Sequence, residues 1–404
     1  LTSIWKTSLA SSESTLPMMN RIKYLTPIIL SVVASCSSKE SAESIVEGAE
    51  NTATNTVDLS YEVDTVMVDA GDQFLFLNWG LSLSDQSKDL NLIYNLNPRA
   101  LLLEVIDLDS LKLKEVIHLE KEGPNGVGNT FYQDLQVLDD GTICLMGSNK
   151  INFVSPSGEL IKTLDFEHIK LKEDQRINYT GKFTEDGKFY VCVLENRDLK
   201  KAPSGIAIID METDSVKVIE MDLFRKLKEF EIKFDNGSVT SIATGDSFYL
   251  NFIENDLIIS SSAFNDVYRY QIKNDILVHR TFNSTLTANE RIANFPNEVD
   301  SEEQFYEVST EAYKQVHFTQ FRELTNFEMF WRISSELDRM IGDSVVYKQV
   351  ITLFDEDFTM LKEKELINFY LSSQSFVKNR VIYSFLNIED ELAFVRLKPI
   401  ITYE

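Results

Sequence analysis

Side chains that commonly carry catalysis or hold a metal ion are few in this sequence and lie far apart. The histidines are His118, His168, His279 and His317, and no His-Glu-x-x-His motif brings two of them onto one helix face, as a local zinc site would require. The Gly-x-Ser-x-Gly turn that presents a nucleophilic serine is also absent. The sequence therefore predicts no catalytic residue from a local motif.

Acidic side chains cluster at three places, and each cluster is typical of a turn. The clusters are Asp107-Leu108-Asp109, Asp355-Glu356-Asp357 and Glu389-Asp390-Glu391. None continues with the glycine and final glutamate of a calcium-binding loop. Each falls where a hairpin turn is expected, and Asp is favoured there because its side chain bonds the local backbone. We predict solvated turns rather than metal sites.

A glycine-rich segment, EKEGPNGVG, runs from Glu120 to Gly128. A phosphate-binding loop would end in Gly-Lys-Ser or Gly-Lys-Thr and lead into a helix, and neither follows here. We predict a shaped turn that crosses from one group of strands to the next, in which glycine permits a positive φ and close backbone approach. The structural residues of this turn are Gly123, Pro124, Asn125, Gly126 and Gly128.

The main candidate for ligand binding is Arg332, in the strand-like segment EMFWRIS. Alternation along a strand places Phe330 and Arg332 on one face and Trp331 on the other. A guanidinium beside aromatic rings suits an anionic or sugar ligand; the alternative is an arginine paired with a carboxylate inside the fold. The candidate binding residues are Phe330, Trp331, Arg332, Arg322 and His317.

Composition limits the class of partner. The 404 residues include 39 Lys and Arg against 64 Asp and Glu, a formal charge of -25, so the chain repels phosphate backbones and a nucleic-acid partner is excluded. Hydrophobic residues make up 43%, which is ordinary for a protein that buries a core. The 26 Phe and 15 Tyr favour strands.

The first 36 residues have the pattern of a secretion signal. Met18 or Met19 is the expected true start, and two positive charges precede the apolar stretch LTPIILSVVAS. This stretch of about 11 residues is shorter than the roughly 20 that span a bilayer, and it has the length of a signal-peptide core. The sequence Val33-Ala34-Ser35-Cys36 resembles a bacterial lipobox, which predicts lipidation of Cys36; ordinary signal cleavage, with Cys36 incidental, is the alternative.

Residues 37–56 are rich in Ser, Glu, Ala, Asn and Thr, which predicts a flexible acidic tether between the lipid and the folded domain. We expect Cys36 to hold the chain on a membrane without a spanning helix. The predicted location is the bacterial cell envelope, with the outer membrane as the expected anchor site. Which side of that membrane the chain occupies stays open.

The rest of the chain, residues 57–404, repeats an all-β unit. An apolar run, a polar turn and a second strand bearing Lys recur in VIDLDSLKLKEVIHL, INFVSPSGELIKTL, IAIIDMETDSVKVI and VITLFDEDFTMLKEKEL. A period of roughly 40–50 residues made of about four strands indicates a β-propeller blade.

Counting strand sets predicts a six-bladed β-propeller. The sets cover about 64–120, 131–166, 178–222, 237–282, 315–366 and 367–404. The last set lacks a strand, and residues 57–68 form an extra strand ahead of the first, so we predict that this N-terminal strand closes the last blade. Seven blades, or a β-sandwich or two packed β domains, are the alternatives.

Two segments, 222–236 and 284–314, interrupt the repeat and are predicted insertions, a common place for function. Helical spacing of Phe305, Val308 and Ala312 predicts a short helix from 301 to 315, which serves a partner or covers a blade edge. Cys144 and Cys192 lie in apolar runs and are expected to be buried free thiols, with a disulfide as the alternative.

The lipobox, the run LIYNLN, the segment DLDSLKLKEVIHLEKEGPNGVG and Phe330-Trp331-Arg332 together resemble the domain of unknown function 4221 family of bacterial lipoproteins. The EGPNGVG stretch is the most specific part, and the resemblance covers most of residues 60–400. It implies a propeller-like fold on a Gram-negative envelope lipoprotein. The family brings no activity with it.

Two functions from different classes are consistent with these patterns. The first is a non-catalytic, lipid-anchored binding or scaffold module, expected to be monomeric and to need no cofactor, for a protein, peptide or glycan partner. The alternative is a propeller hydrolase or lyase whose ligands converge from several blades on a calcium or magnesium ion in the central channel, with His317 and Glu323 as candidates on one strand face.

Overall fold

The computed structural model divides the chain into two compact units, residues 1–42 and 43–404. It describes residues 46–47, 51–77, 80–128, 131–198, 200–237, 240–244, 247–253, 256–324, 328–342, 344–367, 369, 371–372 and 374–403. The predicted leader, its start at Met18 or Met19 and the lipidation site Cys36 lie outside the described residues. Every described strand and helix belongs to the second unit.

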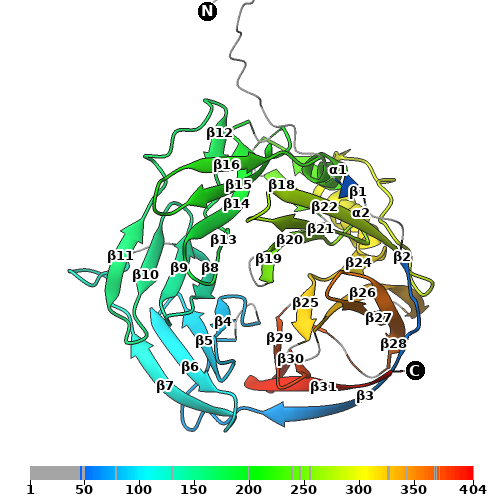
Figure 1. Ribbon diagram of the computed structural model, residues 1–404, viewed down its shortest axis with the longest axis horizontal. Coiled ribbons are helices and arrows are strands. Elements are labelled where there is room, and N and C mark those ends of the chain that lie inside the picture. Colours follow the sequence, from blue (N-terminus) through cyan, green and yellow to red (C-terminus); the bar gives the residue numbers. More distant parts are fainter. Residues whose placement is uncertain are drawn as a thin grey trace, which may run out of the picture. The chain divides into compact units, whose positions relative to one another are not determined.

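Six antiparallel sheets follow one another around a ring (Figure 1). The strands of the first three blades are, in blade 1, β4 (Ser84–Gln86), β5 (Leu92–Asn97), β6 (Leu102–Asp107) and β7 (Lys112–His118); in blade 2, β8 (Tyr132–Val137), β9 (Ile143–Gly147), β10 (Ile151–Val154) and β11 (Leu160–Leu164); and in blade 3, β12 (Gln175–Ile177), β13 (Lys182–Phe183), β14 (Phe189–Asn196), β15 (Gly205–Asp210) and β16 (Val216–Ile219).

Of the other three blades, blades 4 and 6 include strands from a distant part of the chain. The strands of all three are, in blade 4, β19 (Phe248–Ile253), β20 (Asp256–Ser261), β21 (Asp266–Gln271) and β22 (Ile276–Asn283), with β1 (Val46–Glu47) and β2 (Asn51–Thr52) on its edge; in blade 5, β24 (His317–Phe318), β25 (Arg322–Leu324), β26 (Met329–Ile341), β27 (Ser344–Asp355) and β28 (Met360–Leu366); and in blade 6, β29 (Ser375–Lys378), β30 (Val381–Ile388), β31 (Glu391–Tyr403) and β3 (Val57–Met67).

The core is divided among the contacts between neighbouring blades. Middle strands such as β9 and β10 are buried along their whole length because each blade is covered on both faces. Six apolar clusters result, one for each pair of neighbours around the ring, including blade 6 with blade 1. The predicted six-bladed, all-β propeller is confirmed, and the alternatives of seven blades and of a sandwich are set aside.

Ring closure joins the two ends of this unit. β3 pairs with β31 in antiparallel register from Val57 opposite Tyr403 to Met67 opposite Ala393. Val57 and Leu59 place their side chains in the core between blades 5 and 6. The predicted closing strand is therefore confirmed, and it removes the open sheet edge that blade 6 would otherwise present.

The predicted tether ends earlier than residue 56. Strands β1 and β2 pair in parallel with β22, and the amide N–H groups of Thr54 and Asn55 donate to the carbonyl oxygens of Met360 and Leu361 at 3.0 and 2.9 Å. Backbone groups can add to a free sheet edge whatever the composition of their side chains. The polar composition of residues 37–56 predicts a flexible tether throughout, but residues 46–47 and 51–52 form strands on the edge of blade 4.

The two predicted insertions contribute to one small substructure beside blade 4. The first contains α1 (Leu223–Lys228) and β17 (Glu231–Asp235), and the second contains β23 (Glu298–Val299) and α2 (Glu302–Ala312). β17 pairs with β23 and with β18 (Thr240–Thr244) in a three-stranded sheet.

The predicted helix is confirmed as α2. Ser301 caps its first turn by accepting a hydrogen bond from the Gln304 N–H at 3.1 Å. Phe305 and Ala312 are buried against the three-stranded sheet, with Val308 packed beside them. The helix therefore covers that added sheet. No helix among the described residues is long and apolar enough to cross a membrane.

Both cysteines described by the structure are buried, free thiols, as predicted. Cys144 on β9 and Cys192 on β14 lie in the core between blades 2 and 3. Burial raises the pKa of both thiols well above the ordinary range. They are therefore packing residues with little thiolate character.

Candidate functional site

A cavity of about 580 Å³ lies at the centre of the ring, lined by the innermost strand of every blade. These strands are β4, β8, β13, β19, β25 and β29, whose labels surround the middle of Figure 1. We call this cavity the axial channel. Because each innermost strand is flanked on only one side within its blade, its polar side chains can turn toward the channel rather than into the core.

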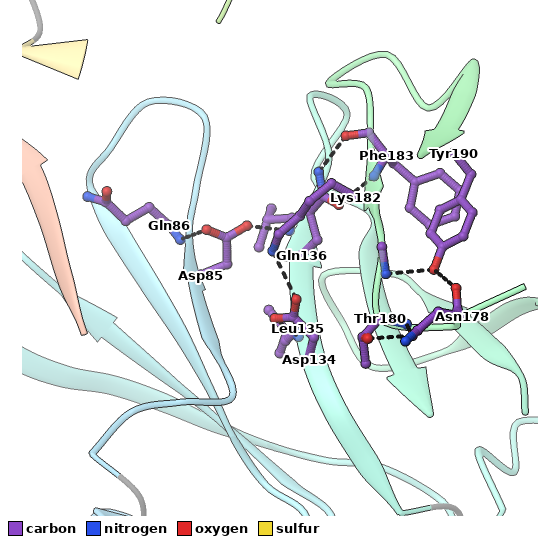
Figure 2. Close-up of polar contacts among 12 residues, drawn as sticks. Asp85, Gln86, Asp134, Leu135, Gln136, Asn178, Thr180, Lys182, Phe183 and Tyr190 are labelled. Atoms are coloured by element: carbon purple, nitrogen blue, oxygen red, sulfur yellow. Dashed lines mark hydrogen bonds and ion pairs between the residues drawn. The ribbon is translucent and has the colours of Figure 1, made fainter. Parts of the chain in front are cut away.

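Asp85 lies on the channel wall where blades 1 and 2 meet (Figure 2). One carboxylate oxygen accepts from the Gln86 N–H at 2.9 Å and the other from the Val137 N–H at 2.9 Å. Burial raises the pKa of Asp85, while Lys182 and the two N–H groups act in the opposite direction. The carboxylate therefore ties β4 to β8.

Lys182 and Gln136 connect blades 2 and 3 across the channel wall (Figure 2). The Lys182 ammonium lies 3.0 Å from an oxygen of Asp134. Burial alone would lower the pKa of Lys182, but Asp134 and Asp85 outweigh burial and the pKa is raised. The Gln136 carboxamide bonds both the N–H and the carbonyl of Phe183, each at 2.8 Å, so its donor and acceptor are both engaged.

Arg322 on β25 is the binding candidate from the sequence that lines the axial channel. Within the described residues it forms no ion pair with a carboxylate. Its Nε lies 3.2 Å from the side-chain oxygen of Gln320 when that carboxamide is oriented so that its nitrogen donates to Asn251. Burial lowers the pKa of Arg322 to about 10, and Asp85 opposes the shift at longer range.

The structure corrects both interpretations of Arg332. Its side chain is almost fully buried between blades 4 and 5, where the guanidinium donates to four backbone carbonyls and meets neither a ligand space nor a carboxylate. The acceptors are Thr319 at 2.9 Å, Asp266 at 3.3 Å, Ser261 at 2.5 Å and Phe264 at 3.1 Å.

Aromatic rings complete the enclosure of Arg332. The guanidinium carbon lies 4.5 Å from the ring centre of Phe318 and 4.7 Å from that of Phe321. Burial lowers the pKa of Arg332 to about 9, so the carbonyl dipoles and the rings compensate for lost water. Arg332 is a structural clamp between two blades.

The predicted alternation around Arg332 holds, but its neighbours are core residues. Phe330 packs between blades 4 and 5 and stacks on Phe358 with ring centres 4.8 Å apart. Trp331 faces the other way, fully buried between blades 5 and 6. Neither reaches the axial channel, so the prediction that they bind a ligand is wrong.

His317 lies away from the axial channel. Its Nδ1 is 2.9 Å from the Gln315 carbonyl, and its ring stacks on Tyr313 with centres 5.8 Å apart. The expected shared face with Glu323 fails because the chain leaves the sheet between β24 and β25, which pair with β26 as separate strands. Alternation therefore does not continue from one residue to the other.

The glycine-rich segment forms the predicted turn from blade 1 to blade 2. Gly123 and Gly128 adopt φ of 94° and 80°, and a Cβ on Gly126 would come within 2.8 Å of the Glu122 backbone. The Val127 carbonyl is held by Tyr132 Oη at 3.1 Å and by Asn152 Nδ2 at 2.7 Å. Pro124 and Asn125 complete the turn, whose role is structural.

The acidic clusters act as turn residues where their contacts are described. Asp107 Oδ1 accepts from the N–H groups of Asp109 and Ser110 at 2.9 and 2.7 Å. Asp355 Oδ1 accepts from those of Asp357 and Thr359 at 3.0 and 2.7 Å. Within the described part of the chain, no group of three or more His, Cys, Asp or Glu side chains is placed to hold a metal ion.

A second cavity, of about 750 Å³, lies over blade 4 and is called here the blade 4 cavity. Its walls come from the two insertions, through α1 with Phe230 and through residues 289–293, and from strands β21 and β22. The sequence pattern predicts both insertions, but it does not show that they lie together. Asp85, Asp134 and Lys182 in the axial channel were also missed.

Two solved structures show the same fold. A member of the domain of unknown function 4221 family from Bacteroides vulgatus has a TM-score of 0.63 at 14% identity, covering 87% of this chain and 99% of its own. A protein from Bacteroides fragilis, presumed to be exported, has a TM-score of 0.50 at 12% identity, covering 89% of this chain and 100% of its own. The comparison with curated proteins gave no significant match.

The family comparison agrees with the fold. The model of the domain of unknown function 4221 family, DUF4221, matches residues 56–365, a range that begins next to the closing strand β3 and ends within β28 of blade 5. This range includes the glycine-rich turn and Arg332, two of the features that carry the resemblance; the lipobox lies outside it. The chain belongs to the DUF4221 family.

Proposed function

We propose that this chain is a non-catalytic binding module of the bacterial cell envelope that holds a small carboxylate-bearing ligand in the axial channel. Arg322 carries the proposal. In the described structure, the channel cations Lys182 and Lys88 are paired with Asp134 and Asp139, whereas Arg322 has only a neutral carboxamide beside it. An enclosed cation without a counter-ion is costly, and a carboxylate is the bidentate partner that a guanidinium fits best.

The size and charge of the axial channel limit the class of ligand that it can hold. A volume of about 580 Å³ is in the range of small-molecule sites, roughly 300–1,000 Å³. Asp139 and Glu185 also line it, so a ligand with several negative charges would be repelled. A single carboxylate on an otherwise neutral body, as in a peptide C-terminus or an acidic sugar, suits this wall.

Binding to purified protein, measured by isothermal titration calorimetry, tests the proposal. Each probe is paired with a counterpart that lacks the carboxylate: D-glucuronate with D-glucose, and N-acetylglycylglycine with N-acetylglycylglycinamide. We expect heat of binding from at least one carboxylate probe and a loss of at least tenfold in affinity for its counterpart. Arg322→Gln should abolish the preference, whereas Arg339→Gln on the exposed end of β26 should keep it.

Two results would overturn this function. If each counterpart binds as tightly as its carboxylate probe, Arg322 does not recognise the ligand. If neither pair binds at all, the channel does not take this class of molecule. The peptide and sugar arms also separate the two sources of the carboxylate.

The envelope location rests on the predicted lipobox at Cys36 and on the Bacteroides fragilis relative presumed to be exported. We infer lipid anchoring at Cys36 in the outer membrane and a monomeric state. Metabolic labelling with radioactive palmitate should mark the protein, and Cys36→Ser should remove the label. A labelled Cys36→Ser variant would place the anchor elsewhere.

A further inference from the structure

The blade 4 cavity is built from parts that the propeller repeat does not need. Residues 222–236 and 284–314 approach each other from separate places in the sequence and enclose the space above β21 and β22. A volume of about 750 Å³ is again in the range of small-ligand sites.

Flat aromatic surfaces form one part of the cavity wall. Phe230 and Phe264 meet edge to face with ring centres 5.9 Å apart. Tyr268 stacks on the imidazole of His279 with centres 4.0 Å apart and planes 10° from parallel. Rings held in this way present rigid apolar faces, which bind a ligand with little loss of side-chain freedom.

Planar polar groups lie beside these rings. The Asp266 carboxylate lies 3.0 Å from His279 Nε2, with side chains only 10% and 12% exposed. Asn265 donates to Asn289 at 3.1 Å, joining blade 4 to the second insertion. Carboxylate, imidazole and carboxamide groups together donate and accept hydrogen bonds, which matches hydroxyl groups because each hydroxyl does both.

The charges near the cavity are largely compensated. On α1, Arg225 pairs with Asp222 at 2.7 Å and with Glu229 at 3.1 Å. The guanidinium of Arg291 lies 5.5 Å from the ring centre of Phe230 and donates to the Ala312 carbonyl at 3.0 Å. The buried Arg291 guanidinium is therefore held by a carbonyl and an aromatic ring of the protein itself, and the cavity favours a ligand without net charge.

We propose that the blade 4 cavity binds a neutral sugar. The apolar C–H face of a pyranose ring packs on the aromatic faces of Phe230 and Phe264, and its hydroxyls exchange hydrogen bonds with the polar groups around Asp266. This site is separate from the axial channel in ligand class and in residues, so either can fail without the other.

Saturation-transfer-difference NMR on the purified full chain tests this site with three probes: D-galactose, D-mannose and N-acetyl-D-glucosamine. We expect saturation of the ring protons of at least one sugar. Phe230→Leu, which keeps apolar volume but removes the flat face, should weaken that sugar at least tenfold. Asp266→Asn, which keeps the shape but removes the charge, should weaken it similarly.

Arg339→Gln on the exposed end of β26 is the matched control and should keep sugar binding unchanged. Thermal unfolding of each variant checks that it is folded, and Phe230→Leu is the variant expected to remain intact because Phe230 is only half-buried. The proposal is overturned if no probe shows saturation, or if Phe230→Leu leaves binding unchanged. It is also overturned if Arg322→Gln removes binding, since the sugar would then occupy the channel.

Discussion

Arg322 and Arg332 lie on paired neighbouring strands of one blade, where Arg322 faces Trp331 in register, yet their surroundings differ completely. Arg332 is inserted between blades and its donors are taken up by four carbonyls. Arg322 is on the channel wall beside one carboxamide. Burial between blades makes Arg332 structural, whereas the position of Arg322 on the channel wall is the basis of its proposed role in ligand binding.

The largest test of this comparison is Arg332→Met. The change leaves four carbonyl groups without their donor inside the blade 4 and blade 5 contact, and we expect a loss of about 4 kcal/mol in the free energy of unfolding. Urea unfolding measures it. Arg322→Gln is the matched control, with an expected loss under about 0.5 kcal/mol.

Equal stability of the two arginine variants would break the comparison. A stable Arg332→Met protein that has lost carboxylate binding would reverse the assignments, because it would make Arg332 the ligand residue.

Asp85 tests whether a channel residue can also hold two blades together. Asp85→Ala leaves the Val137 N–H without its acceptor at the contact between blades 1 and 2, which should cost about 2 kcal/mol in unfolding free energy. Asp85→Asn keeps one acceptor oxygen and should recover part of that loss. Chemical denaturation of the three proteins at one pH provides the comparison; an unchanged midpoint for Asp85→Ala would show that its hydrogen bonds do not hold the two blades together.

The smallest expected effect concerns the ion pair at ring closure. Asp64 on β3 bonds Arg396 and Lys398 on β31 at 2.7 and 2.9 Å, and its hydrogen bond to Arg396 is the main cause that lowers the pKa of Asp64 to about 2. A lowered carboxyl pKa contributes stability above the unfolded value, near 3.8, and this contribution is lost as pH falls toward 2.

Because the Asp64 side chain is 38% exposed, solvent screening should keep this effect under about 1 kcal/mol. Urea midpoints at pH 5 and pH 2.5 should differ less in Asp64→Asn than in the parent protein. Glu62→Gln on the exposed side of the same strand is the control and should follow the parent. An identical acid loss in Asp64→Asn would show that closure depends on backbone pairing alone.

Much of the fold follows from local chemistry that the sequence displays. Turn residues such as Asp107 and Asp355 mark hairpins, the repeat length indicates blades, and an unpaired first strand with an incomplete last set predicts closure through residues 57–68. Each of these signals comes from neighbouring residues or from the number of strands in each set. None of them requires knowledge of which blade a side chain faces.

The candidate site was much less predictable. Alternation along a strand shows which residues share a face, but not whether that face meets a neighbouring blade or the channel. Alternation placed Arg332 and Trp331 on opposite faces, as found, but both faces of a blade are buried against neighbours. Four of the charged residues that line the axial channel, Asp85, Asp134, Lys182 and Arg322, lie on the innermost strands of their blades. Charged residues that recur on the first strand of successive blades could therefore have predicted the channel wall.

The pairing of β3 with β31 also sets an order of events during folding. Residues 57–67 precede their partners, residues 391–403, by the whole of blades 1 to 5. The hairpins of those blades can form one after another, but β3 must wait, unpaired, until β31 is available. An unfinished or truncated chain therefore retains an open circle with two exposed sheet edges, which makes incomplete copies readily distinguishable by proteases from finished ones.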